Sequence, residues 1–145
     1  RLCRDWSSDV CSSDLRQIYV PQVGIRYLYG DLGDVVFQLA SDRLTRQAYL
    51  PVWFPEDTGS VHGQRVPCTL GYHFIIRNNA LHCVYYIRSC DFMRHFRDDV
   101  YMAWRLTQWI VQELDDPTLT TGKLTMHITS FHIFDGDVPI LEAGL

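Results

Sequence analysis

Hydrophobic residues recur along this chain at two spacings, one typical of helices and the other of strands. Between residues 96 and 114 the apolar side chains return every three or four positions, at Phe96, Val100, Ala103, Leu106, Ile110 and Leu114. This spacing predicts a long helix with a single buried stripe. A shorter helix is predicted over residues 31–44, where the same period appears at Leu32, Val35, Val36, Leu39 and Leu44.

Two apolar segments in the middle of the chain have the composition of paired strands. Residues 72–76 and 80–88 are rich in aromatic and branched side chains. They are separated by Arg77-Asn78-Asn79, a sequence that favours a tight hairpin turn. We therefore expect two antiparallel neighbours in a sheet.

Two further segments extend the predicted sheet. Residues 49–54 form a short aromatic and aliphatic strand, in which Pro51 indicates a sheet edge or a bulge. A polar loop containing glycine follows at residues 55–64. Over residues 123–134 apolar and polar side chains alternate, which predicts another strand. The fold class is therefore α/β (α+β), with one mixed sheet, helices packed against it, and a single domain.

Composition excludes some classes of function. The chain has 145 residues, of which 47% are hydrophobic and 21% charged, as in ordinary globular proteins. Its 13 basic and 17 acidic residues give a formal net charge of -4, so nothing favours extensive binding to DNA or RNA. No segment approaches the roughly 20 apolar residues that span a bilayer, and no apolar signal core is present near the start. We expect a cytoplasmic protein whose partners include neither a membrane nor DNA.

The first fifteen residues differ from the rest of the chain. Residues 1–15 are polar, contain Ser-Ser-Asp twice and have no amphipathic period. They resemble the translation of a sequencing-adapter oligonucleotide, so we interpret them as a non-native segment and assign the domain to residues 16–145. A disordered natural terminus is the alternative, and it would not change the functional interpretation.

Cysteine usage indicates reduced thiols. No C-x-x-C pair occurs among the five cysteines, which are Cys3, Cys11, Cys68, Cys83 and Cys90. A cysteine is most often a small buried hydrophobe, and this interpretation suits Cys83 in the middle of a predicted strand. Cys68 follows a polar loop and Pro67 and directly precedes a strand, a position at which a scaffold can present a side chain to a cleft.

The sequence around Cys68 carries a resemblance to a known family. Residues 66–70, VPCTL, and 86–91, YIRSCD, resemble the active-site cysteine of thymidylate synthases and the R-S-x-D signature that follows it, and Arg88 lies 20 residues after Cys68. The family's S-R-R segment, its W-N-P-x-D strand and its H-I-Y motif have similar counterparts in this order at residues 42–47, 50–57 and 131–134. The resemblance covers about residues 26–136.

This resemblance to the thymidylate synthase and pyrimidine hydroxymethylase family implies a thymidylate-synthase-like fold, incomplete at both ends. The family's N-terminal region with a glutamate and a tryptophan and its C-terminal lid have no counterpart in the sequence. Residues 16–145 are thus expected to be a partial catalytic domain, which need not be active as it stands.

The resemblance also implies a chemistry. Cys68 would add as a thiolate to C6 of a pyrimidine, which makes C5 nucleophilic toward the one-carbon unit of 5,10-methylenetetrahydrofolate. A thiol with a free pKa of about 8.5 needs a positive charge nearby to form a thiolate. Arg46 and Arg88 match phosphate-binding arginines of the family, and Ser89 matches a hydroxyl donor to the same phosphate. In the family the arginine at the position of Arg46 reaches across a dimer interface, so we expect a homodimer with shared active sites.

Two further residues match ligand contacts of the family. Asp91 corresponds to the aspartate that holds the pterin ring of the folate, and His132 to a residue that contacts the sugar hydroxyl. Without the motifs, the two arginines would be interpreted as solvated surface charges and His132 as a satisfied strand histidine. We interpret His82 and His127 in that way, and no ligand spacing supports a metal site.

Asp99 occupies the position that reads the base. The family has an asparagine 11 residues after the arginine that Arg88 matches, and its amide accepts from uracil N3-H and donates to O4. An aspartate can accept from the N4 amino group of cytosine and share a proton with N3, and family members acting on deoxycytidylate are similar in carrying aspartate here. Helical phase places Asp99 at the edge of the buried stripe and turns Asp98 about 100° away. Alternatively, both acids simply favour the first turn of a helix.

Several positions depart from the family's pattern. Thr69 replaces a common histidine, Ile87 a glutamine, Gln47 the second arginine of S-R-R, and Phe134 a tyrosine. We favour folate-dependent 5-hydroxymethylation of dCMP. Thymidylate synthesis from dUMP and a catalytically inactive relative that binds nucleotides or RNA remain alternatives, whereas a purely structural subunit has no positive support in the sequence.

Overall fold

The computed structural model of the chain describes residues 32–54, 57 and 66–144. The interpretation of residues 1–15, including Cys3 and Cys11, concerns residues outside these ranges. Most of the polar loop predicted at residues 55–64 also lies outside them.

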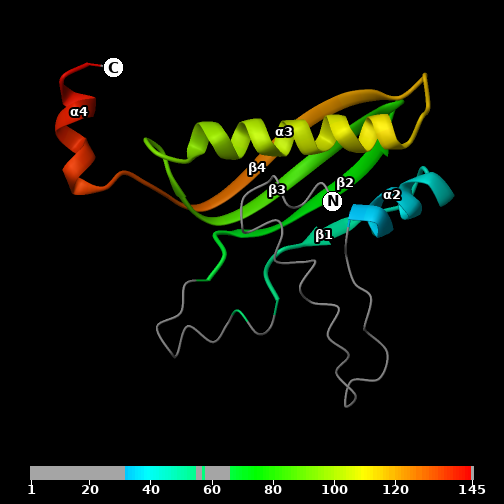
Figure 1. The fold of residues 1–145 in the computed structure, drawn as a ribbon, viewed down its shortest axis with the longest axis horizontal. Coiled ribbons are helices and arrows are strands. Elements are labelled where there is room, and N and C mark those ends of the chain that lie inside the picture. Colours follow the sequence, from blue (N-terminus) through cyan, green and yellow to red (C-terminus); the bar gives the residue numbers. More distant parts are fainter. Residues whose placement is uncertain (1–31, 55–56, 58–65, 145) are drawn as a thin grey trace, which may run out of the picture.

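A four-stranded sheet forms the centre of the fold. Its order is β1 (Tyr49–Pro51), β2 (Thr69–Arg77), β3 (Ala80–Asp91) and β4 (Thr120–His132). The first three strands pair antiparallel, whereas β4 pairs parallel with β3 after the crossover through α3 (Phe96–Glu113). Figure 1 shows α3 lying across β3 and β4. The predicted class, a mixed sheet with packed helices, is confirmed.

One face of the sheet carries the hydrophobic core. Alternate residues of β3 are almost completely buried, namely Leu81, Cys83, Tyr85 and Ile87. They pack with the stripe of α3 formed by Ala103, Leu106 and Ile110, and with Val35 and Leu39 of α2 (Leu32–Ser41). The stripe predicted from the spacing of three and four residues is therefore the surface that α3 buries.

The hairpin between β2 and β3 has the predicted turn. Asn78 and Asn79 adopt positive φ angles of 53° and 55°. A two-residue turn with both central residues in the left-handed region matches the twist of the paired strands, and asparagine tolerates this conformation better than most residues.

Element boundaries differ from the predictions by a few residues. The first helix ends at Ser41 rather than at residue 44, because Asp42 turns the chain and its carboxylate accepts from Leu44 N at 2.9 Å. β1 ends at Pro51 because the next two backbone N–H groups both donate to Leu70 O. Pro51 does lie on a strand at the edge of the described sheet, as predicted.

The end of the chain differs more. β4 ends at His132, whereas the prediction continued the strand to residue 134. A 3-10 turn, η5 (Asp135–Asp137), and a short helix, α4 (Val138–Glu142), follow, and neither was predicted. Figure 1 shows α4 lying beyond the end of the sheet.

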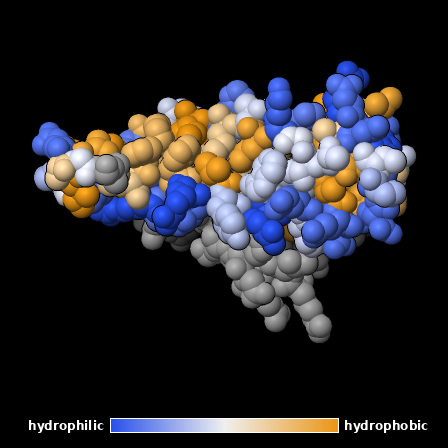
Figure 2. Space-filling view, turned by 90° about the horizontal axis from the view of Figure 1, so that it is seen from above, coloured by the Kyte–Doolittle hydropathy of each residue, from blue (hydrophilic) through white to orange (hydrophobic). Residues whose placement is uncertain are grey.

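An apolar groove of about 490 Å³ lies between α3 and β4. Figure 2 shows hydrophobic residues gathered on the molecular face seen from above. The groove is lined by Phe96, Val100, Trp104, Leu124, Met126 and Ile128. Among the helices of the described ranges, none combines the length and apolar character needed to cross a membrane.

Candidate active site

The topology brings three strand termini together. β2 begins at Thr69, and its antiparallel neighbour β3 ends at Asp91. β4 runs parallel to β3 and ends at His132, which is paired with Asp91. We call this end of the sheet, defined by Thr69, Asp91 and His132, the site end. Segments distant in sequence therefore meet at one place in the fold.

Cys68 and Arg88 lie in contact at the site end. The half-buried Cys68 precedes β2, and its carbonyl oxygen accepts from Arg88 N at 2.9 Å. The Arg88 guanidinium lies 3.9 Å from the Cys68 sulfur (Nη2 to Sγ) and donates to Pro67 O at 2.8 Å and Val66 O at 3.1 Å. It also lies over the Trp53 ring, 5.8 Å from the centroid. These contacts hold a positive charge beside the thiol.

Asp99 projects from the first turn of α3 toward the end of β3. Its Oδ1 accepts from the Tyr85 hydroxyl and its Oδ2 from the Cys90 thiol, each at 3.4 Å. Tyr85 is in turn hydrogen-bonded to Thr69 Oγ1 at 2.8 Å. Asp98 points away, with 66% of its side chain exposed. The predicted helical phase of these two acids is confirmed.

Burial keeps the two donors to Asp99 protonated. The pKa of the Cys90 thiol is raised to about 12, mainly by burial and in addition by the hydrogen bond to Asp99 and the charge of Asp99. Burial also raises the pKa of Tyr85, with additional contributions from Tyr72 and Asp99. Both groups therefore carry their protons at neutral pH and donate to the carboxylate.

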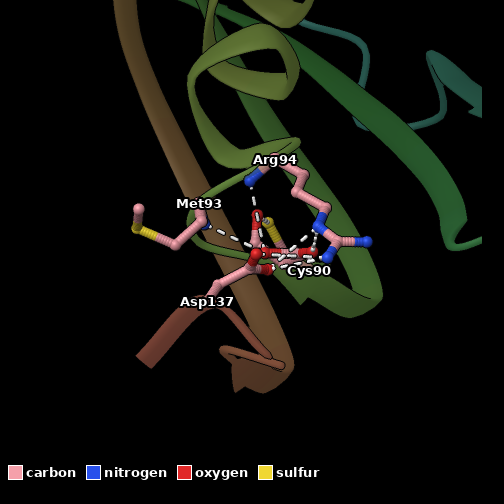
Figure 3. A network of polar contacts seen from close by, with 5 residues as sticks. Cys90, Met93, Arg94 and Asp137 are labelled. Carbon is pink, nitrogen blue, oxygen red and sulfur yellow. Dashed lines mark hydrogen bonds and ion pairs between the residues drawn. The ribbon is translucent and has the colours of Figure 1, made fainter. Parts of the chain in front are cut away.

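Asp91 is buried at the turn between β3 and α3, with 4% of its surface exposed. Its Oδ1 accepts from Met93 N at 2.9 Å and Arg94 N at 3.2 Å (Figure 3). Its Oδ2 accepts no hydrogen bond from the described residues, although Arg94 Nε lies 3.6 Å away. Arg94 also reaches Asp137, donating from Nε to Oδ2 at 2.9 Å. One carboxylate oxygen thus stabilises the turn, and the other retains acceptor capacity.

The remaining predicted residues have different positions. Ser89 and His132 are half-buried on β3 and β4 near the site end, and the His132 ring packs edge-on against Phe134 at 5.2 Å. Arg46 does not join the residues around Cys68. It lies exposed before β1, and its carbonyl oxygen is bonded to His73 Nε2 at 3.0 Å, in the middle of β2. The Arg46 backbone is therefore held beside the middle of β2, whereas Cys68 precedes the start of that strand.

Comparison with known proteins identifies the family. The sequence model of the thymidylate synthase family, described as "Thymidylate synthase", matches residues 5–145. The chain belongs to the thymidylate synthase family. A relative from Methanococcoides burtonii, named "Putative thymidylate synthase", is 28% identical over 108 residues. That alignment covers 74% of this chain and 48% of the relative, so the chain spans about half the length of the curated relative that it matches.

Sequence reasoning did not single out every polar residue of the candidate site. Tyr85, Cys90 and Trp53 contact the expected residues but were not assigned roles of their own. Tyr85 could have been found, because it shares the parity of Cys83 and Ile87 in the strand, and a buried tyrosine needs a partner for its hydroxyl. Across residues 32–54, 57 and 66–144, no group of three or more His, Cys, Asp or Glu side chains could hold a metal ion.

Proposed function

We propose that the full-length protein transfers a one-carbon unit to C5 of a pyrimidine deoxynucleotide, with dCMP as substrate and 5-hydroxymethyl-dCMP as product. The observation that carries this proposal is the position of the Arg88 guanidinium, 3.9 Å from the Cys68 sulfur, at the same end of the sheet as the half-buried carboxylate of Asp99. Membership of the thymidylate synthase family supports the general reaction.

Cys68 acts as the nucleophile in this proposal. The Arg88 guanidinium lies beside the sulfur, where its positive charge can stabilise the covalent chemistry of that atom. The sulfur adds to C6 of the pyrimidine, and C5 then carries the electron density needed to attack an electrophilic carbon. After the new bond forms, C5 loses its proton and the transferred carbon separates from the nitrogen of its carrier, which leaves an exocyclic methylene group on C5. Water adds to this methylene carbon and becomes the hydroxyl group of the product, and the sulfur leaves C6 and takes up the proton of the water. These steps restore the aromatic ring and the free cysteine.

The 5′-phosphate of the nucleotide requires cationic donors. Arg88 supplies a planar guanidinium suited to phosphate oxygens, and Ser89 follows it directly in β3. Arg46 lies exposed and apart from Cys68, a placement that suits a contribution to the active site of the partner in a homodimer. His132, the last residue of β4 and the partner of Asp91 in the sheet, is assigned the contact with the sugar.

Asp99 selects the base. With Tyr85 and Cys90 donating to its two oxygens, the carboxylate can still accept from the N4 amino group of cytosine. The other contact requires a proton shared between Oδ and cytosine N3. Uracil presents N3-H and the O4 acceptor instead, and an ionised carboxylate offers no donor to O4. This difference favours dCMP over dUMP.

Asp91 is the residue that suits the folate. Its buried Oδ2 has acceptor capacity, and the N–H groups of a pterin ring are donors. When bound, 5,10-methylenetetrahydrofolate supplies the one-carbon unit. Because Met93 N and Arg94 N hold Oδ1, the orientation of the Asp91 carboxylate is set before any ligand arrives.

The test is to incubate the full-length protein with methylenetetrahydrofolate and either dCMP or dUMP and to determine the product mass. We expect hydroxymethylated dCMP. Conversion of dUMP alone to dTMP would overturn the choice of base and leave thymidylate synthesis as the function. Release of tritium from C5 of either nucleotide reports the adduct itself, and its absence in the folded full-length protein would favour a binding-only relative.

A further inference from the structure

Tyr85 occupies a position from which it can control the residue that reads the base. Its ring is 1% exposed in the core between the sheet and α3, yet its hydroxyl reaches Asp99 Oδ1 at 3.4 Å. We propose that Tyr85 is a positioning residue that holds the Asp99 carboxylate in the orientation that distinguishes cytosine from uracil. This inference rests on the base-reading role of Asp99 proposed above.

The hydroxyls of Thr69 and Tyr85 form a directed chain that ends on Asp99. The distance between Thr69 Oγ1 and the Tyr85 oxygen is 2.8 Å. A hydroxyl has a single proton, and Tyr85 commits its proton to the carboxylate, so Thr69 donates to Tyr85. Hydrogen bonds in such a chain polarise and strengthen one another. A residue at the start of β2, next to Cys68, is thereby linked to the base-reading carboxylate on α3.

Two donors on two different oxygens fix the plane of the Asp99 carboxylate. Tyr85 donates to Oδ1, and the Cys90 thiol donates to Oδ2. A carboxylate oxygen can accept more than one hydrogen bond, so an interior donor on each oxygen is compatible with a further donor from a ligand. Loss of the Tyr85 donor would weaken the restraint on the terminal torsion of Asp99, which is intrinsically soft.

The position of Tyr85 is rigidly determined by packing. Its ring stacks on Tyr72 with centroids 4.5 Å apart and an interplanar angle of 18°. The stacked rings lie on neighbouring strands, where Tyr72 and Tyr85 are directly paired. The hydroxyl therefore has little freedom to follow Asp99, and it is the carboxylate that must adapt.

The electrostatic surroundings of Asp99 come from both strands beneath α3. The titratable groups that its charge influences are Tyr72 on β2 and Tyr85 and Cys90 on β3, and their pKa values are all raised. On its own helix, Asp98 is exposed and His95 precedes the first turn. Removing the Tyr85 hydroxyl takes away a donor that favours the ionised carboxylate, so the pKa of Asp99 should rise.

The decisive experiment compares Tyr85→Phe with the matched control Tyr86→Phe in the full-length protein. Tyr86 is the next residue of β3, and its ring stacks on His127 at 5.3 Å, away from Asp99. The readout is the pH titration of the Asp99 carboxyl carbon by NMR without nucleotide. We expect the midpoint to rise on the order of one pH unit in Tyr85→Phe and to stay unchanged in Tyr86→Phe. An unchanged midpoint in Tyr85→Phe would overturn the inference.

Kinetics with the two nucleotides add a second readout. We expect the ratio of kcat/KM for dCMP to that for dUMP to fall on the order of tenfold in Tyr85→Phe, with the pH profile for dCMP moved to higher pH. A uniform loss for both nucleotides with an unchanged pH profile would indicate only a structural role. If the unaltered protein turns over neither nucleotide, the proposed function fails, whereas the NMR titration still decides whether Tyr85 acts on Asp99.

If Tyr85→Phe does not fold, a variant that lacks the Thr69 hydroxyl still tests the inference. Thr69→Val removes the donor to Tyr85 and leaves the ring stack in place. The expected change in the Asp99 midpoint has the same sign and a smaller size, because the effect passes through one more hydrogen bond. A change of opposite sign would contradict the proposed chain of donors.

Discussion

The two halves of β3 lie under the same helix but differ in how their polar atoms are satisfied. We call the half with Leu81 and Cys83 the structural half, and the half with Tyr85 and Cys90, together with the neighbouring Cys68 and Asp99, the chemical half. In the first half, Leu81 and Cys83 are completely buried against α3, and Cys83 has Thr107 as its polar neighbour. In the second half, Tyr85 and Cys90 are equally buried but direct a hydroxyl and a thiol to Asp99. Burial alone therefore does not distinguish a structural residue from one that shapes a site.

The difference lies in where the polar atoms of each half are satisfied. Thr107, the polar neighbour of Cys83, donates its hydroxyl proton to Ala103 O at 2.8 Å within its own helix. This hydroxyl donor is therefore satisfied without a ligand. Asp99 on α3 instead accepts hydrogen bonds from Tyr85 and Cys90 of β3, at the end of the sheet where Cys68 and Arg88 lie. A partly buried carboxylate near a cysteine and an arginine at the end of a sheet is where binding and chemistry are expected.

The largest effect should come from Cys68→Ala, which tests the chemical half directly. Without the sulfur no covalent adduct forms, so we expect tritium release from C5 to fall roughly a thousandfold or more. Cys83→Ala in the structural half is the matched control and should retain the reaction. Equal losses in both variants would break the distinction between the two halves.

The structural half is tested by Leu81→Ala. This side chain is 0% exposed, and its removal leaves a cavity between β3 and α3, so urea unfolding should show a loss of about 2–5 kcal/mol. Val84→Ala, on the opposite face of the same strand and half-exposed, should cost less than half as much. The comparison fails if Val84→Ala is the more destabilising variant.

A third prediction concerns specificity at the chemical half. Asp99→Asn restores an amide that can donate to uracil O4, so the ratio of kcat/KM for dCMP to that for dUMP should fall about 10-fold to 100-fold. Asp98→Asn changes a neighbouring acid whose side chain is 66% exposed, and it should leave the ratio unaltered. If the two variants behave alike, the first-turn acids act only through the helix dipole.

The smallest effect is a dependence of stability on pH at the structural half. Burial raises the pKa of Cys83 from its ordinary 9.0 to about 12, although the hydrogen bond with Thr107 opposes the shift. The folded state thus keeps a proton that the unfolded state releases. The stabilisation is present below 9.0 and is lost as pH rises toward 12.

Urea unfolding at about pH 8 and about pH 10 measures this loss. Between these values the unaltered protein should lose roughly 1 kcal/mol more than Cys83→Ala, which has no thiol to ionise at this position. Other titrating groups are common to both proteins and cancel in the difference. Parallel pH profiles for the two proteins would show that Cys83 is not protected from ionisation.

Much of the fold was accessible from local patterns. The period of three and four residues located α3 within one residue at its end, and Asn78-Asn79 identified the hairpin. Boundaries at β1 and β4 were less accurate, because strand ends depend on which neighbour offers a partner. Val52 N, for example, donates to Leu70 O, and this contact is not encoded near residue 52.

The candidate site divides in the same way. Cys68 and Arg88 were proposed from their motif and spacing, and the structure places their side chains in contact at 3.9 Å. Arg46 was proposed from the same kind of evidence but lies apart from them. The contact of Tyr85 with Asp99 was missed, since the parity of a strand residue shows that it is buried but not which polar group meets its hydroxyl.

The sequence by itself determined the helical and strand periodicities and the hairpin turn, because each depends on residues a few positions apart, and its motifs supplied the candidate reactive side chains. Only the tertiary structure decided that Cys90 and Tyr85 donate to opposite oxygens of Asp99, and that Arg94 reaches Asp137, 43 residues away. Hydrogen bonds of this kind depend on strand register and on how α3 crosses the sheet. A buried donor finds its partner through that geometry, which no local spacing specifies.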